Sequence, residues 1–336
     1  MDSIWPWVIF NLFIVGMLAL DLGVFHREAK AVSIKEAAGW SVFWISLALV
    51  FNVLVFNFYD RMQPGSTYTN SEAGFAFLTG YLIEKSLSVD NIFVFVLIFT
   101  SFAVPAAYQH RVLFWGIIGA LVMRAIMIFA GAALIKEFHW VIWIFGAFLI
   151  FTGVRMVLQR DHGHSDPSQH PVVKFFRRII PVTENFEGEK FFTRRNGVLM
   201  ATPLFLTLIM VELTDVVFAV DSIPAIFAVT QEPFIIYTSN VFAILGLRSL
   251  YFVLGGMVDQ FRYLKLGLAG VLVFVGIKML TPDVSALLGV PFKIPTPVSL
   301  SFILAALTIS VVASIIANRR DRAAGIAVGK SVTDTH

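Results

Sequence analysis

The sequence predicts an all-α polytopic membrane protein of about nine transmembrane helices, six of which form two inverted three-helix repeats. Of the 336 residues, 58% are apolar and 14% charged, whereas a soluble domain is about 45–50% apolar and about 25% charged. The apolar residues fall into runs of 18 or more, long enough to cross about 30 Å of hydrocarbon as helices. In lipid such runs must be helical, because their backbone amides are hydrogen-bonded within the segment.

Polar breaks between the runs set the limits of the predicted spans. The nine spans are expected at 4–25, 36–58, 73–101, 108–134, 138–158, 198–228, 234–257, 263–281 and 297–317. The domain division then has two N-terminal spans in 1–71, a first repeat unit in 72–158, a cytoplasmic linker in 159–197, a second repeat unit in 198–281, and the last span in 282–317. Residues 318–336, basic and then polar, are expected to be a disordered cytoplasmic tail.

The positions of the basic residues predict the orientation. With the N-terminus outside, 17 of the 25 Lys and Arg residues fall in cytoplasmic segments, and only Arg61, Lys136 and Lys293 fall outside. The positive-inside rule therefore favours an outer N-terminus and a cytoplasmic C-terminus, in a bacterial-type inner membrane. These bases do not alternate with aromatic residues as in a nucleic-acid surface, so the lipid bilayer is the expected partner and nucleic acid is not.

Short motifs recur in the same order in the two halves of the chain. FLT at Phe77–Thr79, followed by Glu84, returns at Phe205–Thr207, followed by Glu212. Two further matches pair Arg124 and Gly131 with Arg248 and Gly255, and Gly153, Arg155 and Met156 with Gly276, Lys278 and Met279. Because each unit has three helices, the two copies are expected to cross the bilayer in opposite directions.

Five carboxylates lie in the interior of the predicted third and sixth spans: Glu84, Asp90, Glu212, Asp215 and Asp221. A charge at mid-bilayer costs at least about 2.5–3.5 kcal/mol, which favours a functional site. The alternative is a set of structural salt bridges with Lys85, Arg124, Arg155, Arg248 and Lys278. With Asn91, Thr214 and Ser222 nearby and no Cys in the chain, the donors are oxygens, which suit Mg²⁺, Mn²⁺ or Ca²⁺.

Helix geometry separates the acids of one span. Positions 84, 88 and 91 share a face, whereas Asp90 points about 120° away from Glu84 on a regular helix. The two acids converge only if the helix is broken. Pro203 and Pro224 predict such a break in the sixth span, and the third span has no equivalent Pro or Gly between its acids.

Two further groups have a functional and a structural interpretation. Arg124 and Arg248 are interpreted as counter-charges to the acids, with Lys85, rather than as an anion site. His162, His164 and His170 lie in the long loop, where a polar linker is favoured over a metal sensor.

Three segments resemble the TerC family of membrane proteins, and more closely its Alx-like members. They are LALDLGVF at Leu18–Phe25, EKSLSVDN at Glu84–Asn91 and ELTDVVFAVDSIPA at Glu212–Ala225. The resemblance covers nearly the whole chain and implies a place in the LysE-type transporter superfamily. It also implies manganese export, which is linked to some members, as tellurite resistance is to others.

The predicted function is efflux of Mn²⁺ by alternating access, with protons as the counter-ion. The predicted metal ligands are Glu84, Asp90, Asn91, Glu212, Asp215, Asp221 and Ser222, and the transported ion is the only metal expected, with no bound cofactor. Two alternatives remain open: an exporter of an amino acid or oxyanion that uses Arg124 and Arg248, and a non-transporting scaffold of a membrane stress complex. An enzyme is not expected, because no nucleophile has a nearby His base.

Overall fold

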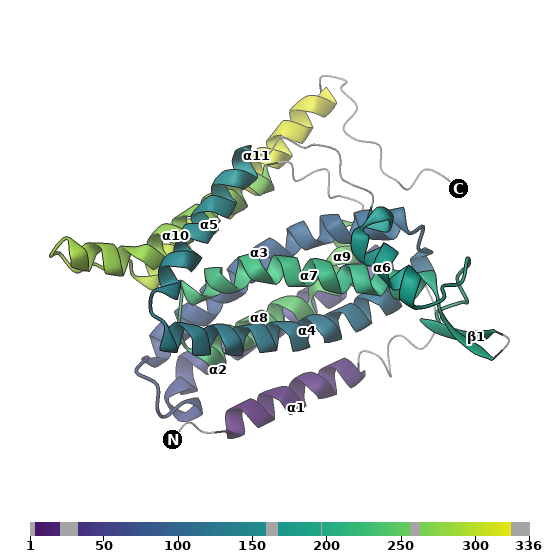
Figure 1. Ribbon diagram of the computed structural model, residues 1–336. Coiled ribbons are helices and arrows are strands. Elements are labelled where there is room, and N and C mark those ends of the chain that lie inside the picture. Colours follow the sequence, from purple (N-terminus) through teal and green to yellow (C-terminus); the bar gives the residue numbers. More distant parts are fainter. Residues whose placement is uncertain (1–3, 21–32, 159–166, 196, 256–262, 324–336) are drawn as a thin grey trace.

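The computed structural model describes residues 4–20, 33–158, 167–195, 197–255 and 263–323, which are helical apart from one short hairpin (Figure 1). The long elements of the first half are α1 (Trp5–Leu20), α2 (Ile34–Met62), α3 (Asn70–Ser101), α4 (Ala106–Glu137) and α5 (Val141–Leu158). The central segment holds η2 (Pro167–Gln169), α6 (Pro171–Ile179), β1 (Phe192–Arg195) and β2 (Val198–Ala201). The second half holds α7 (Pro203–Phe227), α8 (Pro233–Leu245), α9 (Leu247–Leu254), α10 (Leu264–Leu287) and α11 (Thr296–Ala323).

The lengths and composition of the helices confirm an all-α polytopic membrane protein. Among the described residues, seven candidate spans are both long enough and apolar enough to cross a membrane. They are α2, α4, α5, α7, α8 with α9, α10 and α11. Helix α3 is also long, but it carries Glu84, Lys85 and Asp90 close together, and the described part of α1 has 16 residues. The count of nine spans stays a prediction.

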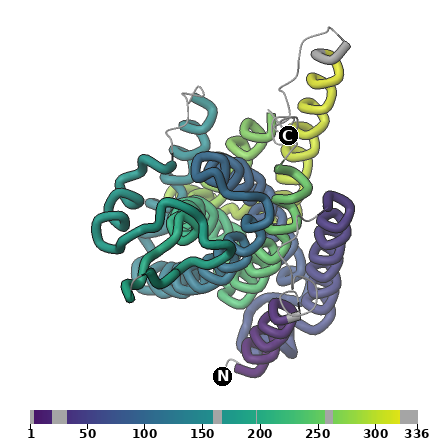
Figure 2. The backbone as a smooth tube through the Cα atoms, turned by 90° about the vertical axis from the view of Figure 1, so that its right-hand side faces the viewer, coloured from purple at the N-terminus to yellow at the C-terminus, as the bar shows by residue number. Residues whose placement is uncertain are grey.

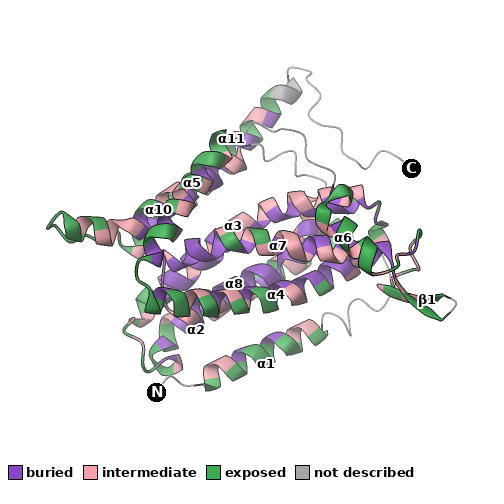
Figure 3. Ribbon diagram, in the orientation of Figure 1, coloured by how far each residue is buried: buried purple, intermediate pink, exposed green. Residues whose placement is uncertain are grey.

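The burial pattern separates a central helix from those at the periphery. Helix α8 is buried along almost its whole length, whereas α2 and α11 leave many of their apolar side chains exposed (Figure 3). Exposed apolar side chains are favourable only in an apolar environment, so these faces are the ones that lipid would cover.

The contacts between helices follow a pattern that an inverted repeat requires. Helix α3 packs against α8 as α4 packs against α7, while α3 with α7, α4 with α8 and α5 with α10 form three further contacting pairs. Exchanging α3 with α7, α4 with α8 and α5 with α10 leaves this set unchanged. Helices α5, α10 and α11 form a tilted layer beside the main bundle (Figures 1 and 2). The superposition of the two units stays a prediction.

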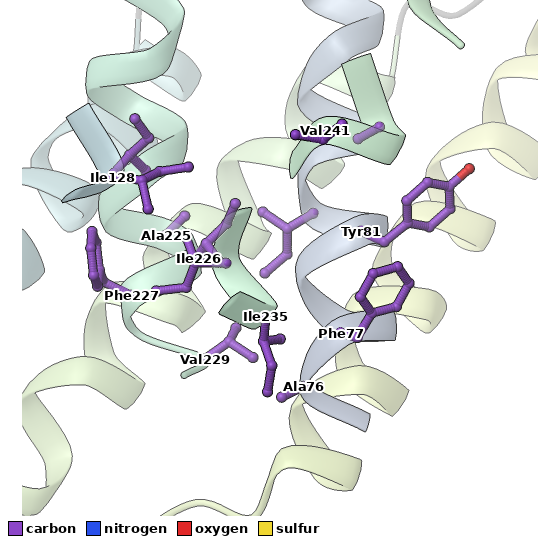
Figure 4. Packing of buried hydrophobic residues seen from close by; sticks show 14 of the residues in the cluster. Ala76, Phe77, Tyr81, Ile128, Ala225, Ile226, Phe227, Val229, Ile235 and Val241 are labelled. Atoms are coloured by element: carbon purple, nitrogen blue, oxygen red, sulfur yellow. The ribbon is translucent and has the colours of Figure 1, made fainter. Parts of the chain in front are cut away.

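The largest apolar cluster joins the helices around α8. Figure 4 shows side chains from α3, α4, α7 and α8 meeting there, among them Phe77, Ile128, Ile226 and Ile235. These four side chains are at most 1% exposed. Close-packed interiors have low compressibility, so these side chains hold the helices, and the polar groups between them, in place.

The predicted limits of two segments were wrong. Residues 198–201, expected to open the sixth span, form β2, which pairs antiparallel with β1. Helix α7 begins instead at Pro203, because proline is favourable in the first turn, where its missing N–H has no helical partner. At the other end, α11 continues to Ala323, so residues 318–323 of the expected disordered tail are helical. Residues 324–336 lie outside the described residues.

The predicted helix break was also placed wrongly. Helix α7 continues through Pro224, which lies three residues before its end, so the missing N–H costs one hydrogen bond near the terminus. The break in the second half lies at Gly246, between α8 and α9. A Cβ at Gly246 would lie 2.5 Å from the Lys85 Nζ, so a glycine leaves room for the lysine. Helix α3 is continuous.

Replacing Gly276 with Val should weaken the contact between α5 and α10. A Cβ at Gly276 would lie 2.8 Å from the Gly146 carbonyl oxygen, and a backbone atom cannot move aside as a side chain can. We expect the free energy of unfolding to fall by about 1–3 kcal/mol, seen as a lower melting temperature in detergent. Gly270→Val is the matched control, because a Cβ at Gly270 has no atom within 4 Å. Equal melting temperatures for the two variants would contradict this prediction.

Candidate functional site

Arg124 lies at the centre of a buried cluster of charged groups. From α4 it donates two parallel hydrogen bonds to Asp215 of α7, with Nε 3.1 Å from Oδ2 and Nη2 3.1 Å from Oδ1. Its Nη1 also pairs with the Glu84 carboxylate of α3. The three side chains are at most 4% exposed, so the arrangement is a buried, bidentate ion pair with an added carboxylate.

Two neutral side chains complete the contacts of Arg124. Its Nη1 lies 3.2 Å from the Asn240 Oδ1 and 3.3 Å from the Ser222 Oγ. The Asn240 amide also donates to the Glu84 Oε2 at 3.3 Å. When both carboxylates are ionised, this cluster holds two negative charges against one positive charge, which favours a cation beside it.

A cavity of about 50 Å³ opens beside this cluster. Its walls come from α3, α4, α5, α7 and α10, and the residues are Glu84, Leu87, Asp90, Asn91, Arg124, Met156, Phe218, Asp221, Ser222 and Leu272. The Asn91 Oδ1 is buried and has no hydrogen-bond partner among the described residues. Asp221 accepts a hydrogen bond from the Thr152 hydroxyl at 3.4 Å. The cavity therefore combines free acceptor oxygens with two carboxylates that Arg124 does not hold.

Acids from two helices, α3 and α7, line the cavity. On α3, Glu84, Ser88 and Asn91 are each 1% exposed, and Asp90 is partly exposed, as the predicted faces require. Asp90 nevertheless lines the cavity with Glu84, and α7 and α10 supply other parts of its wall. Helix α3 is continuous between the two acids, and their convergence on one ion stays a prediction.

Four predicted site residues, Glu212, Lys85, Arg248 and Asp215, do not line this cavity. The Glu212 carboxylate packs against Gly119 of α4. The Lys85 Nζ donates to the Ala243 carbonyl at 3.3 Å, near the end of α8. Arg248 lines a separate cavity of about 10 Å³ with Asp215.

In the part of the chain that the structure describes, no three acidic or histidine side chains are grouped closely enough to hold a metal ion. Arg124 pairs with both Glu84 and Asp215. The assignment of the seven predicted ligands stays a prediction.

Asn240 and Thr152 contact the cluster but are absent from the predicted site. Asn240 follows Thr238 and Ser239 in α8, and all three are at most 1% exposed. Three consecutive polar residues inside an apolar run were a signal for a polar contact. Thr152 had no such signal, because a threonine in a membrane helix commonly bonds to its own backbone.

Of the three loop histidines, His162 and His164 lie outside the described residues. His170 is the N-cap of α6, and its Nδ1 accepts a hydrogen bond from the Val172 amide at 3.3 Å. This contact gives His170 a structural role at the start of the helix. The choice between linker and metal sensor stays open.

A polytopic helical bundle with charged groups buried between its helices defines an integral membrane protein with an internal polar site. The chain belongs to the TerC family of integral membrane proteins, whose sequence pattern matches residues 69–322. The family resemblance seen in the sequence is thus confirmed.

Several bacterial proteins are similar over nearly their whole length. An uncharacterised membrane protein of Myxococcus xanthus is 55% identical over 93% of this chain and 92% of its own. Two proteins named Alx, each described as a proposed membrane-bound redox modulator, come from Salmonella typhi and Escherichia coli K12. They are 51% and 49% identical, covering 91% and 94% of this chain and 92% and 95% of their own. No solved structure matches the chain.

Proposed function

We propose that the protein exports a divalent metal cation, most of all Mn²⁺, through the cavity between Asp90 and Asp221. The observation that carries this proposal is the wall of that cavity, where Asp90, Asp221, Asn91 and Ser222 bring oxygen atoms together beside a cluster of net negative charge. Carboxylate, amide and hydroxyl oxygens are the donors that Mn²⁺, Mg²⁺ and Ca²⁺ prefer.

The fixed ion pair sets how tightly the cavity holds a cation. Arg124 is bound to Glu84 and Asp215, so its positive charge stays close to the cavity in every cycle. A transported ion must bind well enough to enter and weakly enough to leave. Arg124 serves the second requirement, and the carboxylates of Asp90 and Asp221, which Arg124 does not hold, serve the first.

Alternating access and proton exchange complete the proposed cycle. The two inverted units would expose the cavity to one side and then to the other, as rocking of one repeat against its partner does in other carriers. When the cation has left, the buried carboxylates bind protons, because an unpaired buried charge is costly. Protons are therefore the proposed counter-ion, and the cytoplasm is the proposed source of the metal.

The alternatives are less well supported by the contacts. An anion at Arg124 would have to displace Asp215, Glu84, Ser222 and Asn240, which already accept from its guanidinium. A redox role, as the name of the Alx relatives suggests, cannot rest on thiol chemistry of this chain, which has no Cys. We propose a carrier rather than an enzyme or a scaffold.

Flux measurements in everted membrane vesicles test the proposal. Vesicles that contain the protein should take up Mn²⁺ when their interior is acidic, and uptake should stop when the proton gradient is dissipated. Mg²⁺ and Ca²⁺ in separate vesicles measure selectivity. Absence of flux for all three ions, from protein shown to be folded, would leave the scaffold as the better interpretation.

Met156 should favour Mn²⁺ over Mg²⁺ and Ca²⁺. Its thioether lines the cavity together with the oxygen donors, and sulfur ligands suit transition metals better than the hard alkaline-earth ions. We expect Met156→Leu, which keeps the volume, to lower the ratio of Mn²⁺ to Ca²⁺ uptake roughly tenfold, equivalent to about 1.4 kcal/mol. Leu87→Met is the control, because it adds a second thioether to the wall of the same cavity. It should not lower the ratio of Mn²⁺ to Ca²⁺ uptake. An unchanged ratio in Met156→Leu would remove Met156 from the site.

A further inference from the structure

A larger cavity, of about 400 Å³, lies at the end of the bundle opposite α6 and the hairpin. Its walls are the 228–232 turn between α7 and α8, residues 67–68 before α3, the start of α5 with His139, the last turns of α10, and Lys293. Phe227 at its edge lies five residues beyond Ser222 of the acidic cavity, which is about 8 Å along the helix. The two cavities share no residue.

Lys278 of α10 gives this cavity its chemical character. The residue is only 4% exposed, it lines the cavity, and its Nζ has no hydrogen-bond partner within the described ranges. A buried ammonium group has three N–H donors, and leaving them without acceptors is strongly unfavourable. Lys278 therefore needs an acceptor that the described chain does not supply.

The two acids in the same wall differ in their contacts. Glu232 accepts from the Tyr59 hydroxyl at 3.0 Å and from the Ser66 hydroxyl at 2.9 Å. The Asp283 Oδ1 lies 3.2 Å from the His139 Nε2, whereas the Asp283 Oδ2 has no hydrogen-bond partner among the described residues. Lys293, an exposed residue, adds a second ammonium group to the wall. The cavity thus presents two lysines, and neither of its two carboxylates is a hydrogen-bond partner of the Lys278 Nζ.

We propose that this cavity binds a small oxyanion of the phosphate class, with the Lys278 Nζ as principal donor and Lys293 as second donor. The volume admits a phosphate group, and its charged oxygens are the acceptors that a buried ammonium requires. Free phosphate and the phosphate of a lipid headgroup offer the same chemistry. This site does not depend on the proposed export of metal, because it uses none of the residues of the acidic cavity.

Equilibrium dialysis of the purified full-length protein against radiolabelled inorganic phosphate, in neutral detergent, tests the proposal. Wild-type protein should bind phosphate saturably, and chloride should compete with it. Lys278→Met should bind at least about tenfold more weakly, Lys293→Met should show a smaller loss, and Lys278→Arg should retain binding. The matched control is Lys136→Met, a change of an exposed lysine near the end of α4 that lies outside the cavity.

Size-exclusion chromatography shows whether each variant is folded, so a loss of binding is not confused with unfolding. If Lys278→Met does not fold, the comparison of Lys293→Met with Lys136→Met decides. Equal phosphate binding by wild type and the folded lysine-to-methionine variants overturns the proposal, as does absence of saturable binding up to roughly 10 mM phosphate. Nanodiscs identify the source: if phosphatidylglycerol excludes phosphate from wild type, a headgroup occupies the cavity, and if it does not, the ligand is the free anion.

Discussion

Replacing Arg124 with Met is expected to lower the free energy of unfolding by about 3–5 kcal/mol, because two buried carboxylates lose their common partner. Glu84 and Asp215 are at most 3% exposed, and neither can reach water without moving α3 or α7. The melting temperature in detergent should fall strongly, and Arg124→Lys should recover only part of it. A lysine cannot reproduce the two parallel hydrogen bonds that the guanidinium gives to Asp215.

The triple variant Arg124→Met, Glu84→Gln, Asp215→Asn tests whether the unpaired carboxylates cause the loss of stability. Since it removes both orphaned carboxylates with the cation, we expect it to recover most of the lost stability. Arg178→Met, at an exposed position of α6, is the control for loss of an arginine and should melt within about 1 °C of wild type. A single variant Arg124→Met as stable as wild type would show that the ion pair contributes nothing to the folded state.

The fold class follows from composition and periodicity because lipid restricts the backbone to few choices. A run of about 20 apolar residues has to be helical, so α2, α4 and α5 lie where their runs predict them, whereas α10 continues to Leu287, beyond its predicted end at 281. The limits of α7 were not predictable in the same way. Residues 198–201 are as apolar as a helix start, and only the pairing of β2 with β1 removes them from the span.

The site was predictable in its residue types but not in its partners. Charged residues inside apolar runs are visible in the sequence, and Glu84, Asp90 and Asp221 line one cavity. Which acid faces Arg124 depends on how far α4 is rotated against α3 and α7, and a sequence repeat does not fix that rotation. The same rotation turns Glu212 towards Gly119. At the break, Gly246 lies against Lys85, 161 positions earlier in the chain, a contact that no local sequence pattern indicates.

Asp90→Asn and Asp221→Asn are each expected to reduce Mn²⁺ efflux to about one hundredth or less while leaving the protein folded. Asparagine keeps the volume and one acceptor oxygen, so the cavity keeps its shape and loses one negative charge. Removing even an indirect partner of a bound metal costs about 10–100-fold in affinity or activity, and a direct ligand should cost at least as much. Asp60→Asn, at an exposed position of α2, should transport as wild type does. Flux in everted vesicles measures all three variants.

Double variants, in which a nearby cation is neutralised as well, distinguish a metal ligand from a member of a salt bridge. A structural acid has one cationic partner, so removing that partner as well restores the balance of charge. A metal ligand has no such rescue, because the ion supplied the compensating charge. Lys85 donates to a backbone carbonyl and Arg248 lines a cavity with Asp215, and Arg124 holds Glu84 and Asp215. The cations that act on the two aspartates are Lys265 for Asp90 and Arg155 for Asp221. Pairing Asp90→Asn with Lys265→Met, or Asp221→Asn with Arg155→Met, should not recover flux, and neither should neutralisation of Lys85, Arg124 or Arg248. Normal transport by one of the double variants would make the aspartates ion-pair partners, and an anion carrier would then explain the charges of the site better than a metal exporter.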